Sequence, residues 1–352
     1  MGVARRGEEA GRGVPADRDD ARTEHRPGLG DFDDLVRRYR RELHLHCYRM
    51  LGSFDEAEDH VQEVFLRAWR SRERFQGQSS PRTWLYRVAT NACLDTLRQD
   101  ARRAVPAPSS APAGTASAST GPSIAAMPWV QPYPDSLLDQ MAGGQPGPEA
   151  VAVSRETISL AFLAAIQLLP PRQRAVLILR DVVSWPTTQV AELLDTSVPA
   201  VNSALQRART TLRDRWPGGR LDWAPPAEPD PGQRRLLQRF IAAHEQADPE
   251  ALIALLRHDV RLAISPQVGE WNGRQQVGDA LRDGMTSLGQ WRLLPITANR
   301  QPGAAGYLRR PGQTVFFPFV LVVLRLQDDR LIDIAAFEQP SMFPAFGLPA
   351  SL

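Results

Sequence analysis

Amide, hydroxyl and guanidinium side chains gather on one side of the stretch 198–213. They are Asn202, Ser203, Gln206, Arg207, Arg209 and Arg213. Amides and hydroxyls can hydrogen-bond to base edges in the DNA major groove, and guanidinium groups bind phosphate or guanine. The set therefore suits noncovalent reading of a base sequence. An ordinary helical hairpin with a solvated, arginine-rich face stays open as the alternative.

Two helices are needed to present that set. Apolar residues recur at helical spacing on the opposite side, at Val201, Ala204, Leu205, Ala208 and Leu212. A shorter amphipathic helix is predicted for 187–194, followed by a polar break at 195–197. Ser197 is a favourable N-cap, and Pro199 is tolerated in the first helical turn. The pattern predicts a helix-turn-helix whose second helix reads DNA.

A second polar stripe lies on the helix predicted for 82–103. It comprises Trp84, Arg87, Asn91, Asp95 and Arg98, at spacings that share one helix face. An aromatic ring can stack on an unpaired base while arginines hold phosphates, so the stripe suits melted or single-stranded nucleic acid. A half-buried tryptophan on a solvated amphipathic face is the alternative.

Acidic side chains line one side of the helix predicted from Asp55 to Trp69. Asp59, Gln62 and Glu63 lie on or beside that face, and the sequence pattern puts Trp69 on the opposite, buried face. The helix dipole favours acidic residues in a first turn, which accounts for part of the acidity. The remainder predicts a docking face for a basic partner.

Length and composition exclude several classes. A chain of 352 residues has room for two or three domains. It contains neither an apolar run of roughly 20 residues nor the apolar segment of a signal peptide, so we expect a cytoplasmic protein without membrane contact. Cys47 and Cys93 lie in apolar helical patterns and are interpreted as reduced core thiols. No metal site and no cofactor is expected.

Composition divides the chain into six segments. Residues 1–30 are polar and predict a disordered leader or a mis-assigned start codon. The others are, in order, a helical domain at 31–103, a Pro/Ala/Ser-rich linker at 104–150, a second helical domain at 151–216, a short linker at 217–232 and a third domain at 233–352.

The third domain is predicted to be an α+β cone. Helical patterns come first and strand-like runs follow, which predicts a long antiparallel sheet. The strands are mainly aliphatic, and His258, Asp259 and Asp333 near strand ends form no evident catalytic constellation. Whether the cone holds a small-molecule ligand stays open.

Two aromatic groups lie outside any predicted core. Trp129 and Tyr133 interrupt the linker, and Phe343 and Phe346 lie near the C-terminus. Exposed apolar clusters mark interaction sites. We therefore expect interdomain docking through these four residues, with the third domain holding the two helical domains in one arrangement.

Two segments carry a family resemblance. They read DHVQEVFLRAWRSRERFQGQSSPRTWLYRVATNACLDTLR at 59–98, and LPPRQRAVLILRDVV with AELLDTSVPAVNSALQRAR between 169 and 209. They resemble the extracytoplasmic-function (ECF, group IV) sigma-70 factors, and the whole chain is similar to the SigJ/SigG-like actinobacterial type. The resemblance implies a subunit that binds core RNA polymerase and promoter DNA and carries out no covalent chemistry.

The resemblance also implies roles for individual residues. Asp59, Gln62 and Glu63 would bind the polymerase, whose contacts in this family are the beta-prime clamp and the beta flap. The surface for the minus-10 element would comprise Phe75, Ser79, Arg82, Trp84, Arg87, Asn91, Asp95 and Arg98. The surface for the minus-35 element would comprise Ser197, Ala200, Asn202, Ser203, Gln206, Arg207, Arg209 and Arg213. A departure is Asp195, where many helix-turn-helix turns carry glycine.

The third domain looks like the SnoaL-like, NTF2-fold modules that are fused to some of these factors. There it would modulate activity in place of a separate anti-sigma protein. Fold analogy alone assigns no catalysis. Two alternatives remain: a helix-turn-helix regulator that never binds polymerase, and an NTF2-fold enzyme with a DNA-binding appendage.

Overall fold

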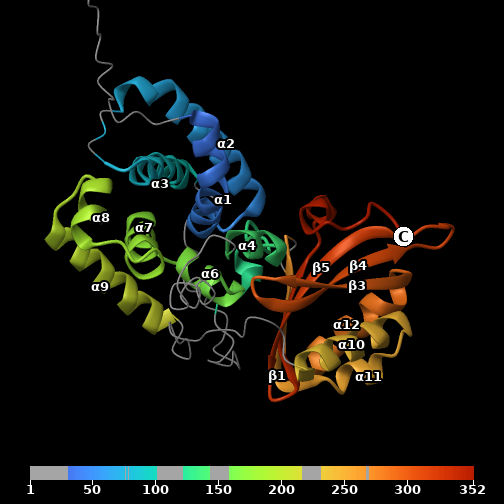
Figure 1. Cartoon of the computed structure of the whole chain (residues 1–352). Helices are drawn as coiled ribbons and strands as arrows, with labels where there is room; N and C mark the ends of the chain where they lie inside the picture. The colour runs from blue at the N-terminus through green and yellow to red at the C-terminus, as the bar shows by residue number, and fades with distance from the viewer. Residues whose placement is uncertain are drawn as a thin grey trace, which may run out of the picture.

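The structure is a computed structural model that describes residues 31–75, 77, 79–100, 122–142, 158–215, 231–266 and 269–352. Four parts are visible in Figure 1: a first helical domain (31–100), a linker segment (122–142), a second helical domain (158–215) and a sheet domain (231–352). The linker segment lies between the first helical domain and the sheet domain. The expected leader at 1–30 and the short linker up to residue 230 lie outside the described residues.

Three long helices build the first helical domain. They are α1 (Phe32–Leu51), α2 (Phe54–Ser71) and α3 (Pro81–Gln99), with the short η1 (Arg72–Arg74) after α2. Ser53 and Ser80 cap α2 and α3 by accepting hydrogen bonds from the amides of Glu56 and Thr83. The predicted third helix reached residue 103, whereas α3 ends at Gln99 because Asp100 leaves the helical conformation.

The linker segment is not an open tether over its described residues. It contains η3 (Ile124–Ala126) and α4 (Asp135–Ala142). Met127, Val130 and Tyr133 are buried, each no more than 2% exposed. Since so short a segment cannot enclose a core of its own, its apolar side chains complete the core shared by the helical domains and the sheet domain.

The second helical domain ends in the predicted helix-turn-helix. Its elements are α6 (Leu160–Gln167), α7 (Pro171–Leu177), the π-helical η4 (Ile178–Val182), α8 (Thr187–Leu193) and α9 (Val198–Arg215). Of the apolar residues predicted to face inward from α9, Val201, Leu205, Ala208 and Leu212 are buried and Ala204 is half-buried. Asp195 between α8 and α9 has φ 50°, a left-handed conformation. Asp tolerates this conformation better than most residues, which explains how the turn forms without glycine.

Six strands, three α-helices and one 3₁₀-helix build the sheet domain. The elements are α10 (Pro231–Glu245), α11 (Pro249–Ile253), β1 (Leu256–Ser265), β2 (Gly269–Asn272), α12 (Arg274–Ser287), β3 (Gln290–Ala298), β4 (Gln301–Arg309), β5 (Phe317–Gln327), β6 (Arg330–Phe337) and η5 (Pro340–Phe346). The strand order is β2-β1-β6-β5-β4-β3. The prediction of an antiparallel sheet is wrong at one place, because β1 and β6 pair in parallel. The four-residue β2 is too short to show an alternating pattern in the sequence.

The two faces of the sheet have different partners. Leu262, Leu324 and Ile334 point to the face that packs on α10 and α12, where aliphatic and aromatic side chains fill the interior. Their neighbours Ala263 and Val323 point to the outer face and join the core of the helical domains and the linker segment. The expected fold class, two all-α domains followed by an α+β, NTF2-like domain, is confirmed.

Candidate nucleic-acid interfaces

The polar face of α9 is open to solvent. All eight residues assigned to the minus-35 surface are exposed: Ser197, Ala200, Asn202, Ser203, Gln206, Arg207, Arg209 and Arg213. The hydroxyl of Ser197 accepts a hydrogen bond from the amide of Ala200 at 3.3 Å, as expected for an N-cap. The structure thus presents these side chains together on one helix.

Not all arginines of α9 are equally available. Arg209 forms two hydrogen bonds with the Asp181 carboxylate, at 2.9 and 2.7 Å, and this bond raises the pKa of Arg209. Arg213 donates to the carbonyl of Arg209 and to the hydroxyl of Thr210. A phosphate would compete with Asp181 for Arg209. All three arginines of the assigned set are exposed, but Arg209 and Arg213 already form hydrogen bonds within the protein.

The polar stripe on α3 is partly covered. Trp84 is half-buried beneath Phe75, with ring centroids 5.3 Å apart. Asn91 and Arg98 are exposed, and Arg98 pairs with Asp95 at 2.5 Å. Ser79 is half-buried in the loop before α3. Phe75 and Trp84 therefore pack on each other while both stay partly exposed.

The second helical domain lies directly on α3. The guanidinium of Arg87 donates to the carbonyl of Glu192 at the end of α8, at 3.1 Å. The amide of Gln189 donates to the hydroxyl of Thr83 at 2.9 Å. Arg87, which is assigned to the minus-10 surface, therefore bonds α8 although its side chain is exposed.

Aromatic contacts extend the same interface. Trp185, which precedes α8, packs on Tyr86 of α3 with ring centroids 4.8 Å apart. The guanidinium of Arg82 lies over both rings, at 5.3 and 5.4 Å, and forms an ion pair with Glu42. Arg82, assigned to minus-10 DNA, is thus held between the two helical domains. We call this contact of α3 with Trp185 and α8 the α3–α8 interface.

The proposed docking face on α2 is exposed and only partly acidic. Asp59 and Gln62 are exposed, and Glu63 bonds Arg67 at 2.7 Å, which lowers the pKa of Glu63. The prediction that Trp69 is buried is wrong, since 47% of it is exposed. Leu66 is 50% exposed. The one-turn spacing of Gln62, Leu66 and Trp69 was the signal for this apolar extension of the face.

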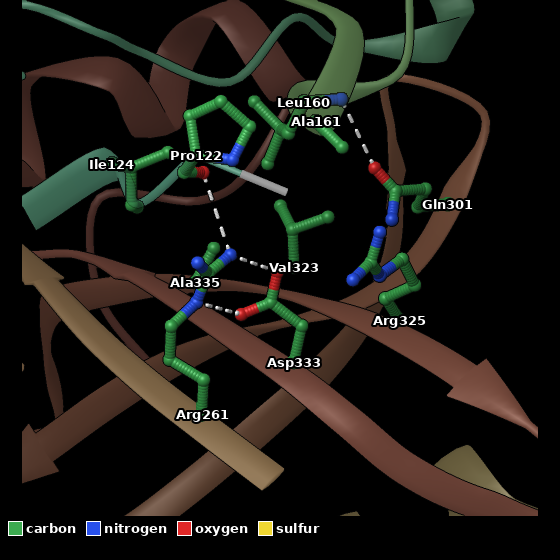
Figure 2. A pocket seen from close by; sticks show the side chains of 10 residues that line it. All are labelled: Pro122, Ile124, Leu160, Ala161, Arg261, Gln301, Val323, Arg325, Asp333 and Ala335. Carbon is green, nitrogen blue, oxygen red and sulfur yellow. Dashed lines mark hydrogen bonds and ion pairs between the residues drawn. The ribbon is translucent and has the colours of Figure 1, made fainter. Parts of the chain in front are cut away.

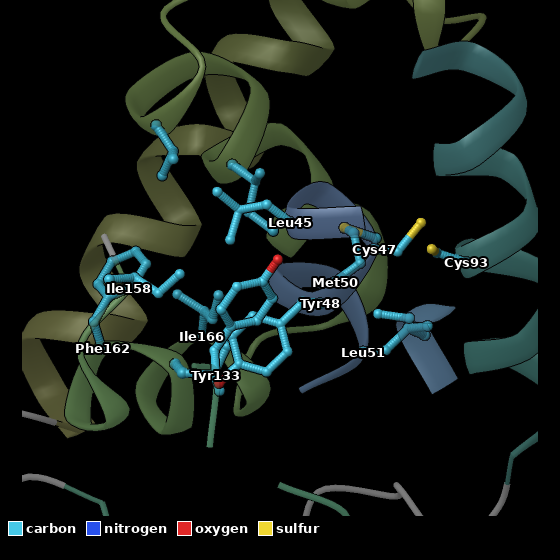
Figure 3. Packing of buried hydrophobic residues seen from close by; sticks show 14 of the residues in the cluster. Leu45, Cys47, Tyr48, Met50, Leu51, Cys93, Tyr133, Ile158, Phe162 and Ile166 are labelled. Carbon is cyan, nitrogen blue, oxygen red and sulfur yellow. The ribbon is translucent and has the colours of Figure 1, made fainter. Parts of the chain in front are cut away.

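Tyr133 is the docking residue with the largest set of contacts. Its hydroxyl bonds Nδ1 of His44 at 3.0 Å, and its ring packs on those of Tyr48 and Phe54. Figure 3 shows Tyr133 beside Tyr48, with Ile158 of the second helical domain close by. Burial raises the pKa of Tyr133 and lowers that of His44 to about 4, so both groups are neutral at pH 7.

The other three docking residues have smaller roles. Trp129 is half-buried against the shared core. Phe343 is buried edge-on against Tyr307 of its own domain, with ring centroids 5.1 Å apart. Phe346 is half-buried at the margin of the same cluster. The two phenylalanines thus belong to the cluster that the sheet domain shares with the helical domains, and their role in interdomain docking stays a prediction.

A small cavity lies where the sheet domain, the linker segment and α6 meet (Figure 2). The Asp333 carboxylate bonds Arg261 at 3.0 and 2.8 Å, and Arg261 also donates to the carbonyl of Pro122 at 3.5 Å. The negative charge of Asp333 is thus paired with Arg261 on the outer face of the sheet, away from the domain interior. Asp259 pairs with Arg257. These carboxylates serve as ion-pair partners.

Comparison with known proteins decides the family. Residues 35–103 match the model of Sigma-70 region 2, and residues 159–212 match Sigma-70, region 4. The ECF RNA polymerase sigma factor SigG of Mycobacterium tuberculosis is 42% identical over 329 residues, covering 92% of this chain and 85% of SigG. The chain belongs to the ECF sigma factors. It directs transcription initiation by RNA polymerase and is not an enzyme.

Two further sigma factors are similar to this chain in sequence or in structure. SigW of Bacillus subtilis is 31% identical over 195 residues, covering 52% of this chain and 87% of SigW. The crystal structure of SigJ from Mycobacterium tuberculosis aligns with 90% of this chain and 99% of that chain, with a TM-score of 0.55 and 19% identity. The overall fold is therefore shared with SigJ.

Sigma factors bind core RNA polymerase and promoter DNA, so the alternative of a regulator that never binds polymerase is wrong. Among the described residues, none of the helices combines the length and apolarity needed to cross a bilayer. Within the same residues, no three His, Cys, Asp or Glu side chains are arranged to hold a metal ion.

Proposed function

We propose that the three surfaces of this sigma factor divide its work as follows. The face of α2 with Asp59, Gln62 and Glu63 binds the beta-prime clamp of core polymerase, with Leu66 and Trp69 as its apolar part. A face that mixes acidic rim residues with exposed apolar side chains suits a stable protein interface. The second helical domain contacts the beta flap, and the protein works in the cytoplasm, where its polymerase is.

The DNA surfaces follow the two polar helix faces. The stripe on α3 and its preceding loop open and read the minus-10 element. The exposed side chains of α9 read the minus-35 element, with Asn202, Ser203 and Gln206 on base edges and Arg207, Arg209 and Arg213 mainly on phosphates. Their common exposure on one face of α9 supports this assignment.

The sheet domain modulates this activity by favouring a closed arrangement. The two promoter elements are separated by roughly 25 base pairs, which is about 85 Å of B-DNA. Packed helices lie about 10 Å apart. Since α8 lies on α3 and α9 lies on α8, the closed chain cannot reach both elements. Asn299 of the sheet domain carries this proposal, because its side chain bonds both Tyr48 of the first helical domain and the Ile158 carbonyl of the second. In the same arrangement Arg87, a minus-10 residue, bonds the Glu192 carbonyl.

Run-off transcription with purified core polymerase tests the proposal. Gln189→Ala removes the hydrogen bond to Thr83 and leaves the DNA surfaces intact. A hydrogen bond contributes about 0.5–1.5 kcal/mol, so the closed arrangement should weaken by about two- to tenfold. The transcript yield should rise at limiting promoter concentration. Thr188→Ala, at an exposed neighbouring position, is the matched control. An equal yield from both variants would remove the modulatory role and leave the promoter assignments standing.

A further inference from the structure

The turn between β3 and β4 inserts one side chain among three parts of the chain. Asn299 is fully buried and has φ 53°, a conformation that Asn tolerates in tight turns. Its side-chain amide donates to the hydroxyl of Tyr48 in α1 at 2.9 Å and to the carbonyl of Ile158 at 2.6 Å. Its side-chain carbonyl accepts from the amide of Tyr133 at 2.8 Å. This one residue therefore contacts both helical domains and the linker segment.

The sheet domain is bound firmly to the linker segment at this turn. The amide of Asn299 donates to the carbonyl of Tyr133 at 2.9 Å, and Pro134 forms an isolated β-bridge with Ala298. The amide of Arg300 donates to the Asp135 carboxylate at 2.9 Å, and its guanidinium pairs with Asp139 at 2.5 Å. The linker segment thus extends the edge of the sheet.

The linker segment is bound equally firmly to the first helical domain. The side-chain carbonyl of Gln131 accepts from the Ser53 hydroxyl at 2.7 Å and from the Asp55 amide at 2.9 Å. Its amide donates to the Asp55 carboxylate and to Gln339 of the sheet domain, both at 2.8 Å. A single buried side chain therefore joins the first helical domain directly to the sheet domain.

The sheet domain holds the second helical domain at fewer points. The amide group of Asn299 reaches the carbonyl of Ile158, and the side-chain carbonyl of Gln301 accepts from the amide of Leu160 at 3.2 Å. Both contacts involve the backbone just before or at the first residue of α6. This domain also bonds the first helical domain, as in the hydrogen bond from buried Arg174 to the carbonyl of Met50 at 2.5 Å.

We propose that the sheet domain and the linker segment stay attached to the first helical domain when the protein engages a promoter, and that the second helical domain alone swings away. This rests on the proposed function, in which the closed arrangement cannot span both elements. Residues 143–157 and 216–230, fifteen each, connect the second helical domain to the rest. A chain of fifteen residues reaches about 50 Å when extended, which permits such a movement.

Two double variants of the full chain test the proposal. Asp55→Cys with Gln339→Cys allows the first helical domain to be tethered to the sheet domain, because both side chains bond the same Gln131 amide. Thr83→Cys with Gln189→Cys allows α3 to be tethered to α8. A short bis-methanethiosulfonate reagent forms each tether, and dithiothreitol cleaves it. Cys47 and Cys93 are fully buried, so the unsubstituted chain treated with the same reagent is the control.

Run-off transcription with core polymerase is measured before and after cleavage. The tether at 55 and 339 should leave the yield unchanged, whereas the tether at 83 and 189 should reduce it at least tenfold until it is cleaved. If the tether at 55 and 339 also abolishes transcription reversibly, the sheet domain must leave the first helical domain and the proposal is wrong. If the tether at 83 and 189 leaves transcription intact, the closed arrangement is competent and the proposed modulation fails instead.

Discussion

The helices α3 and α9 are both amphipathic and both carry arginines and amides, yet their polar faces have different surroundings. On α9 the eight assigned residues are exposed. On α3, Arg87 bonds the Glu192 carbonyl and Arg82 lies between Tyr86 and Trp185. The contrast teaches that a helical pattern identifies a binding face but does not show whether that face is free.

The same contrast suggests an order of events on a promoter. On the proposed assignment, the exposed face of α9 is free to meet DNA in the closed chain, whereas Arg82 and Arg87 of α3 first have to leave their partners. The proposal then predicts that the minus-35 element is engaged before the minus-10 element.

The largest effect is expected for α3, whose polar face is partly covered. Trp84→Ala removes the ring that would stack on an unpaired base, which is worth about 1–3 kcal/mol. Open-complex formation, measured by permanganate reactivity of unpaired thymines, should fall by about five- to 150-fold. Binding to a double-stranded minus-35 fragment should not change. A parallel loss on that fragment would show that Trp84 supports the fold of the protein and has no role in reading unpaired bases.

On α9, substitutions of base-reading residues and of phosphate-binding residues should have different effects on DNA binding. Gln206→Ala should relax preference at one position of the minus-35 element, at a cost of about 1–3 kcal/mol. Arg207→Ala should weaken all sequences alike and reduce the salt slope of binding by about one unit. Fluorescence anisotropy with a set of single-substituted duplexes distinguishes the two signatures. Equal effects of Gln206→Ala on every duplex would count against its role as a base reader.

The attachment of the linker segment should depend on pH. Burial raises the pKa of Asp135 from 3.8 to about 6, so the docked form binds a proton more tightly than the undocked form. Docking should therefore strengthen by about tenfold as the pH falls from 7 to 5, relative to Asp135→Asn. Burial lowers the pKa of His44 to about 4, so protonation of His44 weakens docking as the pH falls. This effect is the same in the wild type and in Asp135→Asn, and it therefore cancels when the two proteins are compared.

Hydrogen exchange at the Arg300 amide measures this docking, because that amide donates to the Asp135 carboxylate. Wild type and Asp135→Asn are compared at each pH, which removes the intrinsic pH dependence of exchange. A ratio that stays constant from pH 7 to pH 5 would contradict the prediction.

The smallest effect is expected within α9 itself. Arg209 already bonds Asp181, so a phosphate gains less from it than from Arg207. Arg209→Ala should therefore cost a few tenths of a kcal/mol less in DNA affinity than Arg207→Ala, in line with the small worth of exposed ion pairs. Asp181→Asn should strengthen binding slightly. Identical losses for the two arginine variants would show that the Asp181 pair does not restrain Arg209.

Local patterns predicted the helical parts well. The helix-turn-helix follows from apolar spacing and from the Ser197 cap, which involve neighbouring residues only. Trp69 was misplaced because it lies at the end of α2, where Arg72 and Phe32 cover only part of its ring. Sequence pattern identifies the buried side of a helix less surely there, since fewer neighbouring elements surround its last turn.

Long-range pairing could not be derived in the same way. The parallel pairing of β1 with β6 joins strands at opposite ends of the domain. The role of Asn299 was missed because an Asn between two strands is typical of a tight turn. Its partners Tyr48 and Ile158 are far away in sequence, and only the folded chain brings them together.

The outer face of the sheet decides which parts of this protein can be transferred to another sigma factor. Small residues such as Ala263 and Ala335 let the linker segment lie close to the strands, and Gln131 inserts between Asp55 and Gln339. A chimera that grafts the sheet domain alone onto another sigma factor would lack matching surfaces on both sides. Residues 31–142 and 231–352 should be transplanted as one module, whereas exchanging the second helical domain, the proposed minus-35 reader, for that of a relative should redirect the protein to new promoters.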